Sequence, residues 1–472
     1  MSSALISRVA VGALAMATLA ACSVSDLVNN TDLPANIQDP GIIKTPDGAL
    51  GLYYTAVSSA ATAFGGGGST TSFIEASGLL TDELRTAGNS NFPTSGAQAI
   101  DSRTVPNNDY SANGKTRMTM AQAVYRNLQR VRGNTNEAIG ALAKYAPAAS
   151  PALRGHAYAL QGLADVMLAE LYCSGIPLST LDFEKGYTLA PGSTSEQVYT
   201  AALALFDSAD KYSADSARFV LLAKMGRARA LLALDRYADA RAAVADVPTD
   251  YQYAFSYSAD SYFPNLFRAD PSYWTNSVAD QDGGNGLPYI TSADPRSKSF
   301  KLSGVPNPGG LNDRWFPSAY ATTYGNAPIV FASGLEARLI DAEAALAAGD
   351  GTWLATLNAL RTTCATAAGC PTPAPAGEGG VTGLPPLNDP GTDAARVTLL
   401  FNERAYWLFL SGHRQGDLRR LVRQYHRLPQ TVYPAGFWGL GVSPFGDAVS
   451  LPLPVDEQID NPLYKGCISR EA

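Results

Sequence analysis

The residue types that most often carry catalysis are sparse in this sequence. Its 472 residues include three histidines, His156, His413 and His426, which leave little room for a Ser-His-Asp triad or a metal cluster. The adjacent acids Asp82 and Glu83 cannot flank a scissile bond as glycosidase carboxylates do, and we interpret them as solvated acids at a helix end. No Gly-x-Ser-x-Gly, His-Glu-x-x-His or dinucleotide-binding motif occurs. The sequence therefore predicts a protein that is not an enzyme and that uses no cofactor and no metal.

A segment rich in aromatic side chains indicates a different chemistry, the binding of sugars. Sugars present apolar C–H faces and rims of hydroxyl groups, so their sites need flat aromatic platforms with Asn, Asp or Arg nearby. Residues 251–328 supply both, and helical periodicity is lost there. The candidate ligand-binding residues are Trp274, Trp315, Tyr320, Tyr273 and Tyr324. The alternative for each of these rings is that it packs the segment against the rest of the fold.

Amphipathic helices on both sides must position this segment. Apolar residues recur at helical spacing in the stretches 49–64, 71–85, 118–142, 151–171, 195–212, 216–234, 333–348 and 353–361. Two side chains within them, His156 and Asp165, are interpreted as satisfied residues of the helix surface. The stretch 226–248 resembles a tetratricopeptide repeat, because small alanines alternate with the bulky Tyr237.

These patterns predict a mainly α fold. A stack of tetratricopeptide-type helical pairs, at about 118–248 and 333–425, is expected to carry a large, loop-rich aromatic insertion at about 251–328. The composition, 46% apolar and 16% charged, favours a folded chain over a disordered one. The formal net charge of −7 without a basic tract indicates a protein that does not bind nucleic acid.

The stretch 401–420 predicts a helix, a sharp stop and a second helix. Asp393 suits the start of the first helix, and Gly412 suits the left-handed residue that closes it. The second helix is expected to begin near Asp417, whose carboxylate favours the positive end of a helix dipole. The arginines of this region, Arg414, Arg419, Arg420 and Arg423, fit a solvated helix face about as well as an anion site.

The same stretch resembles the C-terminal signature of the SusD/RagB family of lipoproteins. The matching residues, in order, are Glu403, Arg404, Leu408, Gly412, His413, Arg414, Asp417, Leu418 and Arg420. Trp407 and Ser411 stand where acids are usual, and Gln415-Gly416 replaces an aromatic pair, so the chain resembles a divergent member. The resemblance is strongest in 118–248 and 333–462 and implies a SusD-like fold.

The N-terminal residues resemble a bacterial lipoprotein signal. Arg8 is followed by an apolar run, residues 9–21, that is short for a membrane span. Leu19-Ala20-Ala21-Cys22 resembles a lipobox, so residues 1–21 are predicted to be a signal peptide and Cys22 to carry acyl chains. An ordinary secretory leader is the alternative. Residues 22–45 are expected to form a tether, and 46–472 a single SusD-like domain.

Four further cysteines leave their pairing open. Cys364 and Cys370 flank a short loop and suit a small disulfide, whereas Cys173 and Cys467 suit a long-range one. Sequence alone does not establish either connectivity.

The resemblance implies a function in nutrient uptake. It implies an outer-membrane lipoprotein, lipid-anchored at the cell surface, that captures an oligosaccharide or a peptide and passes it to a SusC-like, TonB-dependent transporter. Two other classes remain open. A tetratricopeptide-type scaffold for protein or peptide partners predicts an apolar groove on the concave helical face. An α-helical glycan hydrolase predicts two carboxylates about 5–10 Å apart in an aromatic cleft.

Overall fold

The computed structural model describes residues 42–67, 71–87, 95–105, 119–182, 186–258, 264–267, 275–302, 314–320, 325–363, 381, 383–439 and 441–471. Within them the helices are α3 (Pro46–Gly65), α4 (Phe73–Leu80), α5 (Gly96–Asp101), α6 (Thr119–Tyr145), α7 (Pro151–Leu171), α8 (Ser195–Tyr212), α9 (Ala217–Ala233), α10 (Tyr237–Val244), α11 (Gly334–Ala347), α12 (Thr352–Thr363), α13 (Asp393–Trp407), α14 (Arg414–Arg423), α15 (Pro429–Val432) and α16 (Val455–Asp460). The predicted mainly α fold is confirmed.

The strands are short and pair two by two. They are β1 (Leu84–Thr86), β2 (Ile176–Pro177), β3 (Thr180–Asp182), β4 (Gly186–Thr188), β5 (Gly192–Ser193), β6 (Gln252–Phe255), β7 (Asn276–Val278), β8 (Ser299–Leu302), β9 (Arg314–Pro317), β10 (Ile329–Ser333), β11 (Phe437–Trp438) and β12 (Ser443–Pro444). Single 3-10 turns are η1 (Ile42–Lys44), η3 (Asp282–Gly284), η4 (Pro295–Ser297) and η5 (Ser318–Tyr320). All the pairs, β1–β7, β2–β5, β3–β4, β6–β10, β8–β9 and β11–β12, are antiparallel.

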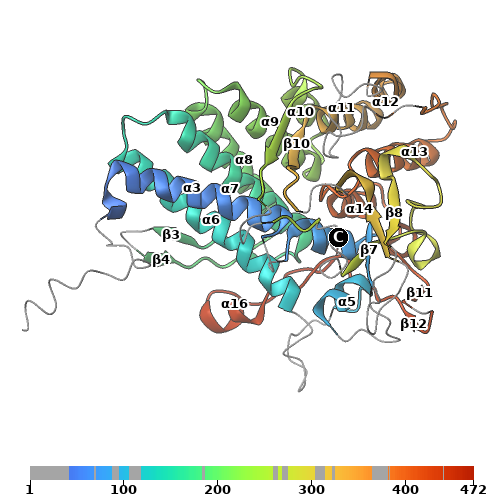
Figure 1. Ribbon diagram of the computed structural model, residues 1–472, viewed down its shortest axis with the longest axis horizontal. Coiled ribbons are helices and arrows are strands. Elements are labelled where there is room, and N and C mark those ends of the chain that lie inside the picture. The colour runs from blue at the N-terminus through green and yellow to red at the C-terminus, as the bar shows by residue number, and fades with distance from the viewer. Residues whose placement is uncertain are drawn as a thin grey trace, which may run out of the picture.

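One side of the molecule is a stack of helices that pack in chain order. Helix α3 lies along α6, α6 along α7, α7 along α8 and α8 along α9, and the series continues through α10 and α11 to α12 (Figure 1). Close approach depends on glycine at the centre of the stack. A Cβ atom on Gly162 of α7 would lie 2.8 Å from the ring of Phe206 on α8, and one on Gly226 of α9 would lie 2.4 Å from it. The large core of the protein surrounds this contact.

The aromatic segment starts and ends on one antiparallel pair. Strand β6 pairs with β10, with Phe255 opposite Ile329, so the segment leaves the helical stack and returns to it at the same place. Between them, β7 pairs with β1 from the N-terminal part of the chain, and β8 pairs with β9. The described part of the segment contains no α-helix, as expected, and uses short strand pairs in addition to loops.

Several local expectations need correction. The stretch 71–85 is not one helix, because α4 ends at Leu80 and β1 follows from Leu84. The second helix of the C-terminal hairpin begins at Arg414 and not near Asp417, and the residue that caps α13 is Thr392, whose hydroxyl oxygen accepts from the Ala395 amide at 3.3 Å. The first helix also ends earlier than predicted, at Trp407 with Leu408 as its C-cap, so Gly412 does not close it. Leu410 (φ 55°) and Gly412 (φ 78°) have positive φ in the turn that follows.

The C-terminal segment is fastened to α7 by covalent and hydrogen bonds. Cys173 and Cys467 form a disulfide across 294 positions of the chain. The Cys173 amide donates to the Leu451 carbonyl oxygen (2.8 Å), and the Ser174 amide donates to that of Ser469 (2.9 Å). The long-range pairing is therefore present, and the predicted Cys364–Cys370 pairing lies outside the described residues. In the portion that is described, no helix has the length and apolarity of a membrane span.

Candidate ligand-binding site

The signature in and around α13 and α14 forms a buried ionic network. Its members are Asp82, Glu336, Glu343, Arg404, His413, Arg414, Asp417 and Arg420. Arg404 donates from Nε and Nη2 to the two oxygens of Asp417, both at 2.8 Å, and the side chains of this pair are each 2% exposed. Burial alone would raise the pKa of Asp417, but Arg404 and Arg420 outweigh it and hold that pKa well below its usual range.

The remaining members join distant helices to this pair. Arg420 donates to Glu343 of α11 at 2.9 and 3.1 Å, and Arg414 donates to Asp82 at 2.7 and 2.8 Å. The His413 Nε2 atom lies 3.0 Å from the Glu336 Oε1 atom. These contacts fix α14 against α4 and α11, so the network positions the fold and presents no open surface to a ligand.

Several side chains that we expected at the surface are instead buried. Asp82 and Glu83 are each 1% exposed, and Glu83 accepts a hydrogen bond from the Leu410 amide at 2.9 Å. Burial raises the pKa of Glu83 to about 8, so this carboxyl is protonated at neutral pH. His156, between Tyr53 and Tyr253, and Asp165 are buried as well. Of the four arginines interpreted as a solvated face or an anion site, Arg414, Arg419 and Arg420 are buried and Arg423 alone reaches the surface.

The structure describes two of the five predicted ligand-binding residues. Trp315 lies in β9 opposite Lys301, is half-buried, and packs against the large core. Tyr320, in η5, is 4% exposed and stacks on Phe267 with ring centroids 3.9 Å apart. Tyr273, Trp274 and Tyr324 lie outside the described residues, as does Cys22. The structure brings no described pair of these five together as an open platform.

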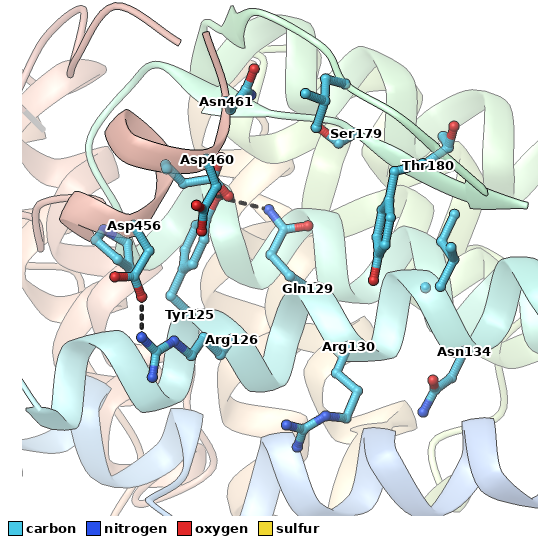
Figure 2. Close-up of a pocket in the computed structure, with 16 residues that line it drawn as sticks. Tyr125, Arg126, Gln129, Arg130, Asn134, Ser179, Thr180, Asp456, Asp460 and Asn461 are labelled. Carbon is cyan, nitrogen blue, oxygen red and sulfur yellow. Dashed lines mark hydrogen bonds and ion pairs between the residues drawn. The ribbon is translucent and has the colours of Figure 1, made fainter. Parts of the chain in front are cut away.

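An open groove of about 400 Å³ lies on the outer side of α6 (Figure 2). We call it the α6 groove: its floor is α6, one wall is the β3–β4 hairpin with its flanking residues, and the other wall is α16 and its flanks. Residues that line it include Tyr125, Gln129, Arg130 and Asn134 from α6, Thr180, Tyr187 and Leu189 from the hairpin side, and Asp456, Glu457 and Asp460 from α16. Its volume lies in the usual range for small-molecule sites, so the groove is a candidate for ligand binding.

Polar side chains of α6 hold the hairpin wall in place. Asn136 donates from Nδ2 to the Leu181 carbonyl oxygen (2.6 Å), and Arg132 donates from Nη1 to that of Ser179 (3.0 Å). Arg132 is itself fixed by buried Asp165, whose Oδ1 atom lies 2.6 Å from Nε. Gly133 of α6 faces Leu181, where a side chain would fill part of the space. These hydrogen bonds therefore fix the position of the hairpin relative to α6.

The second wall is fixed from the same helix. Tyr125 donates its hydroxyl to Glu457 (2.9 Å), and Gln129 donates to the Tyr125 oxygen (2.9 Å), while Arg126 forms an ion pair with Asp456 (Figure 2). Burial raises the pKa of the Tyr125 hydroxyl well above its usual value, so it remains a neutral donor. Two of the three carboxylates of this wall thus have protein partners.

The exposed groups of the groove suit a sugar. Tyr187 is 75% exposed and Leu189 is 40% exposed, while Arg130, Thr180 and Asp460 offer donors and acceptors at the rim. A flat ring beside such groups can stack on a C–H face and bond the hydroxyls around it. The carboxylates all come from α16, on one side of the groove, whereas a glycosidase needs acids that flank the bond it cleaves. The sequence analysis did not single out Tyr187, because this residue lies outside the aromatic-rich segment. The short strand Gly186-Tyr187-Thr188 was the available signal, because alternate side chains of a strand point to opposite faces.

In the residues that are described, no group of His, Cys, Asp and Glu side chains has the arrangement of a metal site.

No protein-family model and no curated protein matches the chain. Solved structures do match it. A SusD superfamily protein from Bacteroides thetaiotaomicron is similar with a TM-score of 0.64 at 13% identity, over 90% of this chain and 99% of that one. The surface glycan-binding protein A from Bacteroides uniformis is similar with a TM-score of 0.63 at 14% identity, and a laminarin-binding SusD-like protein with a TM-score of 0.62 at 14% identity. Each match covers 90% of this chain and 99% of the other.

Proposed function

We propose that this chain, which has the SusD-like fold, captures an oligosaccharide and passes it to a SusC-like, TonB-dependent transporter without breaking a bond. In this proposal Cys22 carries the lipid that anchors the protein in the outer membrane, at the cell surface. The observation that carries the proposal is the likeness over nine-tenths of the chain to a surface glycan-binding protein and to a laminarin-binding protein.

The α6 groove supports the same function on geometric grounds. It combines an exposed ring, Tyr187, with rim groups that can bond hydroxyls, and its walls are fixed before a ligand arrives. A preformed site loses little conformational entropy on binding. A second candidate for contact is the aromatic segment, through Trp274, Tyr273, Tyr324 and the half-buried Trp315, whereas the predicted Tyr320 is buried.

A screen of the soluble form that starts at Ser23 tests capture. We expect saturable binding to at least one glycan on an array and in calorimetry, with no shortened product in the mixture after long incubation. Tyr187→Ala should weaken binding about tenfold if the α6 groove holds the ligand, because removal of a central aromatic contact typically costs more than about 1 kcal/mol. Trp274→Ala and Trp315→Ala report on the aromatic segment. Phe437→Ala is the matched control, since Phe437 is an aromatic residue that is 64% exposed on β11.

The outcomes of this screen separate the classes of function. Release of shorter sugars would replace capture by hydrolysis. Binding to peptides and to no glycan would favour a peptide carrier or a scaffold.

The anchor and the hand-over need their own measurements. Cys22→Ala in the full chain should abolish incorporation of a labelled fatty acid and release the protein from the membrane fraction. Purification of the wild-type chain in mild detergent should recover a TonB-dependent barrel with it. A chain that retains the labelled fatty acid after Cys22→Ala would contradict the lipid site.

A further inference from the structure

A second hollow lies beside α6, on the side that faces α3. It has a volume of about 550 Å³ and lies between α3 and α6, and we call it the α3 hollow. Tyr54 of α3, at its edge, is 65% exposed and meets its neighbour Tyr53 edge-on, with ring centroids 5.3 Å apart. Hydroxyl side chains supply most of its α3 wall, among them Thr55, Ser58, Ser59 and Thr62. The hollow therefore repeats the composition of the α6 groove: one exposed tyrosine ring beside hydrogen-bonding groups.

Two residues of α6 line both spaces. Arg130 and Asn134 belong to the α6 groove and also to the α3 hollow. They are four residues apart, so they lie one above the other on a single face of the helix. Figure 2 shows both side chains leaving α6 on the side away from Ser179 and Thr180. The α6 groove and the α3 hollow are thus neighbours across one helix, with a guanidinium and an amide between them.

Two hydroxyl groups of the α3 wall, those of Thr55 and Ser59, are oriented to accept hydrogen bonds from a ligand. Thr55 donates its hydroxyl to the Gly51 carbonyl oxygen (2.9 Å), and Ser59 donates to that of Ala56 (2.8 Å). Each hydroxyl hydrogen is used inside the helix, so the oxygen lone pairs remain as acceptors. Arg130 is exposed and carries five N–H donors, one of which bonds the Asn127 Oδ1 atom at 3.2 Å. A ligand rich in hydroxyl and ether oxygens matches this set of acceptors and donors.

We propose that the α6 groove and the α3 hollow form one binding surface for an extended oligosaccharide that crosses α6 at Arg130 and Asn134. This inference rests on the proposed function and deepens it by naming the class of ligand. Tyr187 and Tyr54 are the two stacking platforms, and Arg130 and Asn134 bond the sugar between them. Each space alone has the volume of a small-molecule site, so a chain in contact with both is several sugars long.

The charges of this surface favour a neutral glycan. Asp456, Glu457 and Asp460 line the α6 groove, where an anionic sugar would meet a like charge. Arg126 is paired with Asp456 and Arg130 lines the same groove, so the three carboxylates exceed the two guanidinium groups by one negative charge. Arg130 is the only charged residue among those that line the α3 hollow in the described part of the chain. We therefore expect neutral chains to bind more tightly than uronic-acid chains of equal length.

Calorimetry with glycans of graded length tests the proposal. The probes are neutral β-glucan and α-glucan fragments from disaccharide to octasaccharide, together with their parent polysaccharides and any further glycan that the array returns. We expect affinity to rise with length until both spaces are filled. Tyr54→Ala and Tyr187→Ala should each weaken binding of the longest fragment about tenfold. For the shortest fragment, at most one of the two changes should matter, and Arg130→Ala should weaken long chains more than short ones.

The controls separate the possible failures. Phe437→Ala should leave every affinity unchanged, and near-identical unfolding curves for Tyr54→Ala and wild type would show that the fold is retained. Binding that does not depend on length, or that Tyr54→Ala leaves intact for the longest chains, would overturn the crossing of α6 while capture itself stands. If no glycan binds at all, the proposed function fails and this inference falls with it.

Discussion

The buried ionic network and the α6 groove use the same types of side chain in opposite surroundings. Each contains an arginine–carboxylate pair, Arg404 with Asp417 in the network and Arg126 with Asp456 in the groove. The two side chains of the first pair are each 2% exposed, whereas those of the second are 57% and 40% exposed. A buried pair cannot lose one partner without leaving a charge in a poor solvent, but an exposed pair can exchange its partner for water or a ligand.

The difference separates what identifies the fold from what can meet a ligand. The signature, residues 403–420, contributes five members of the network, and all five are buried. They are Arg404, His413, Arg414, Asp417 and Arg420. The α6 groove draws on α6, β3–β4 and α16, where the side chains at the rim are exposed. A sequence signature can therefore report a folding requirement, and the search for a binding site has to start from exposure.

The largest expected effect comes from removing Arg404. Arg404→Ala leaves Asp417 and Glu343 with less compensation in the core, so we expect the free energy of unfolding to fall by about 3–5 kcal/mol. Urea unfolding followed by circular dichroism measures this change. Arg126→Ala is the matched control and should change the same quantity by no more than about 1 kcal/mol.

A second variant keeps this test informative if Arg404→Ala does not fold. Arg404→Lys retains the charge but loses the two-pronged hydrogen bonding, so it should give a smaller loss that can still be measured. Equal losses for the network and the groove variants would remove the distinction between the two regions.

The disulfide offers the next effect in size. Cys467→Ser opens a covalent link that spans 294 positions and fastens the segment after α16, and we expect the free energy of unfolding to fall by about 2–5 kcal/mol. Chemical denaturation of the oxidised proteins measures it. The double change Cys173→Ala with Cys467→Ser should lose little more than the single change, because both remove one bond. Additive losses would mean that each cysteine acts through packing instead.

Glu83 gives an effect that depends on pH. Its pKa is raised from 4.5 to about 8 in the folded protein, because burial penalises the charged form. The folded chain therefore binds a proton between these values that the unfolded chain has lost, so the contribution of Glu83 to stability is complete below pH 4.5 and is lost as the pH rises through about 8. Each pH unit in this window removes up to about 1.4 kcal/mol.

The variant Glu83→Gln isolates this term from all other titrations. Between pH 5 and 8 the unfolding free energy of Glu83→Gln should fall less steeply with pH than that of wild type. The two slopes should differ by up to about 1.4 kcal/mol per pH unit, the value for one bound proton. Parallel curves for the two proteins would show that Glu83 is already ionised in the folded state.

Local patterns predicted the helices well and the buried charges poorly. Helices α7 and α8 have the predicted bounds, because apolar period and terminal capping act within a few residues of the chain. Asp82 was misplaced at the surface, because the partner that makes its burial possible, Arg414, is 332 positions away. The misplacement of Asp165 has the same cause, since Arg132 lies on another helix.

The binding role of the aromatic segment stays a prediction, and the α6 groove, the candidate site of the structure, contains none of the predicted residues among the described residues that line it. Its exposed ring, Tyr187, depends on how the β3–β4 hairpin stands over α6, which is set by side-chain bonds from Arg132 and Asn136 to hairpin carbonyls. Such bonds leave no periodic trace in a sequence. Tyr320, by contrast, packs on Phe267. The residues next to Tyr320 in the sequence give no sign of this long-range contact.

The smallest expected effect on stability is that of Tyr187, and it is the most direct test of the distinction between folding and binding. Its side chain is 75% exposed, so Tyr187→Ala should change the free energy of unfolding by no more than about 0.5 kcal/mol. Tyr172 is the matched comparison: it is fully buried, its hydroxyl donates to the Ala121 carbonyl oxygen at 2.5 Å, and Tyr172→Ala should cost about 3–5 kcal/mol. Both are measured by the same denaturant titration. A ring that contributes nothing to folding yet lies over a fixed groove is available for a ligand, so a loss above about 1 kcal/mol for Tyr187→Ala would assign the ring to hairpin packing and end its role as a platform.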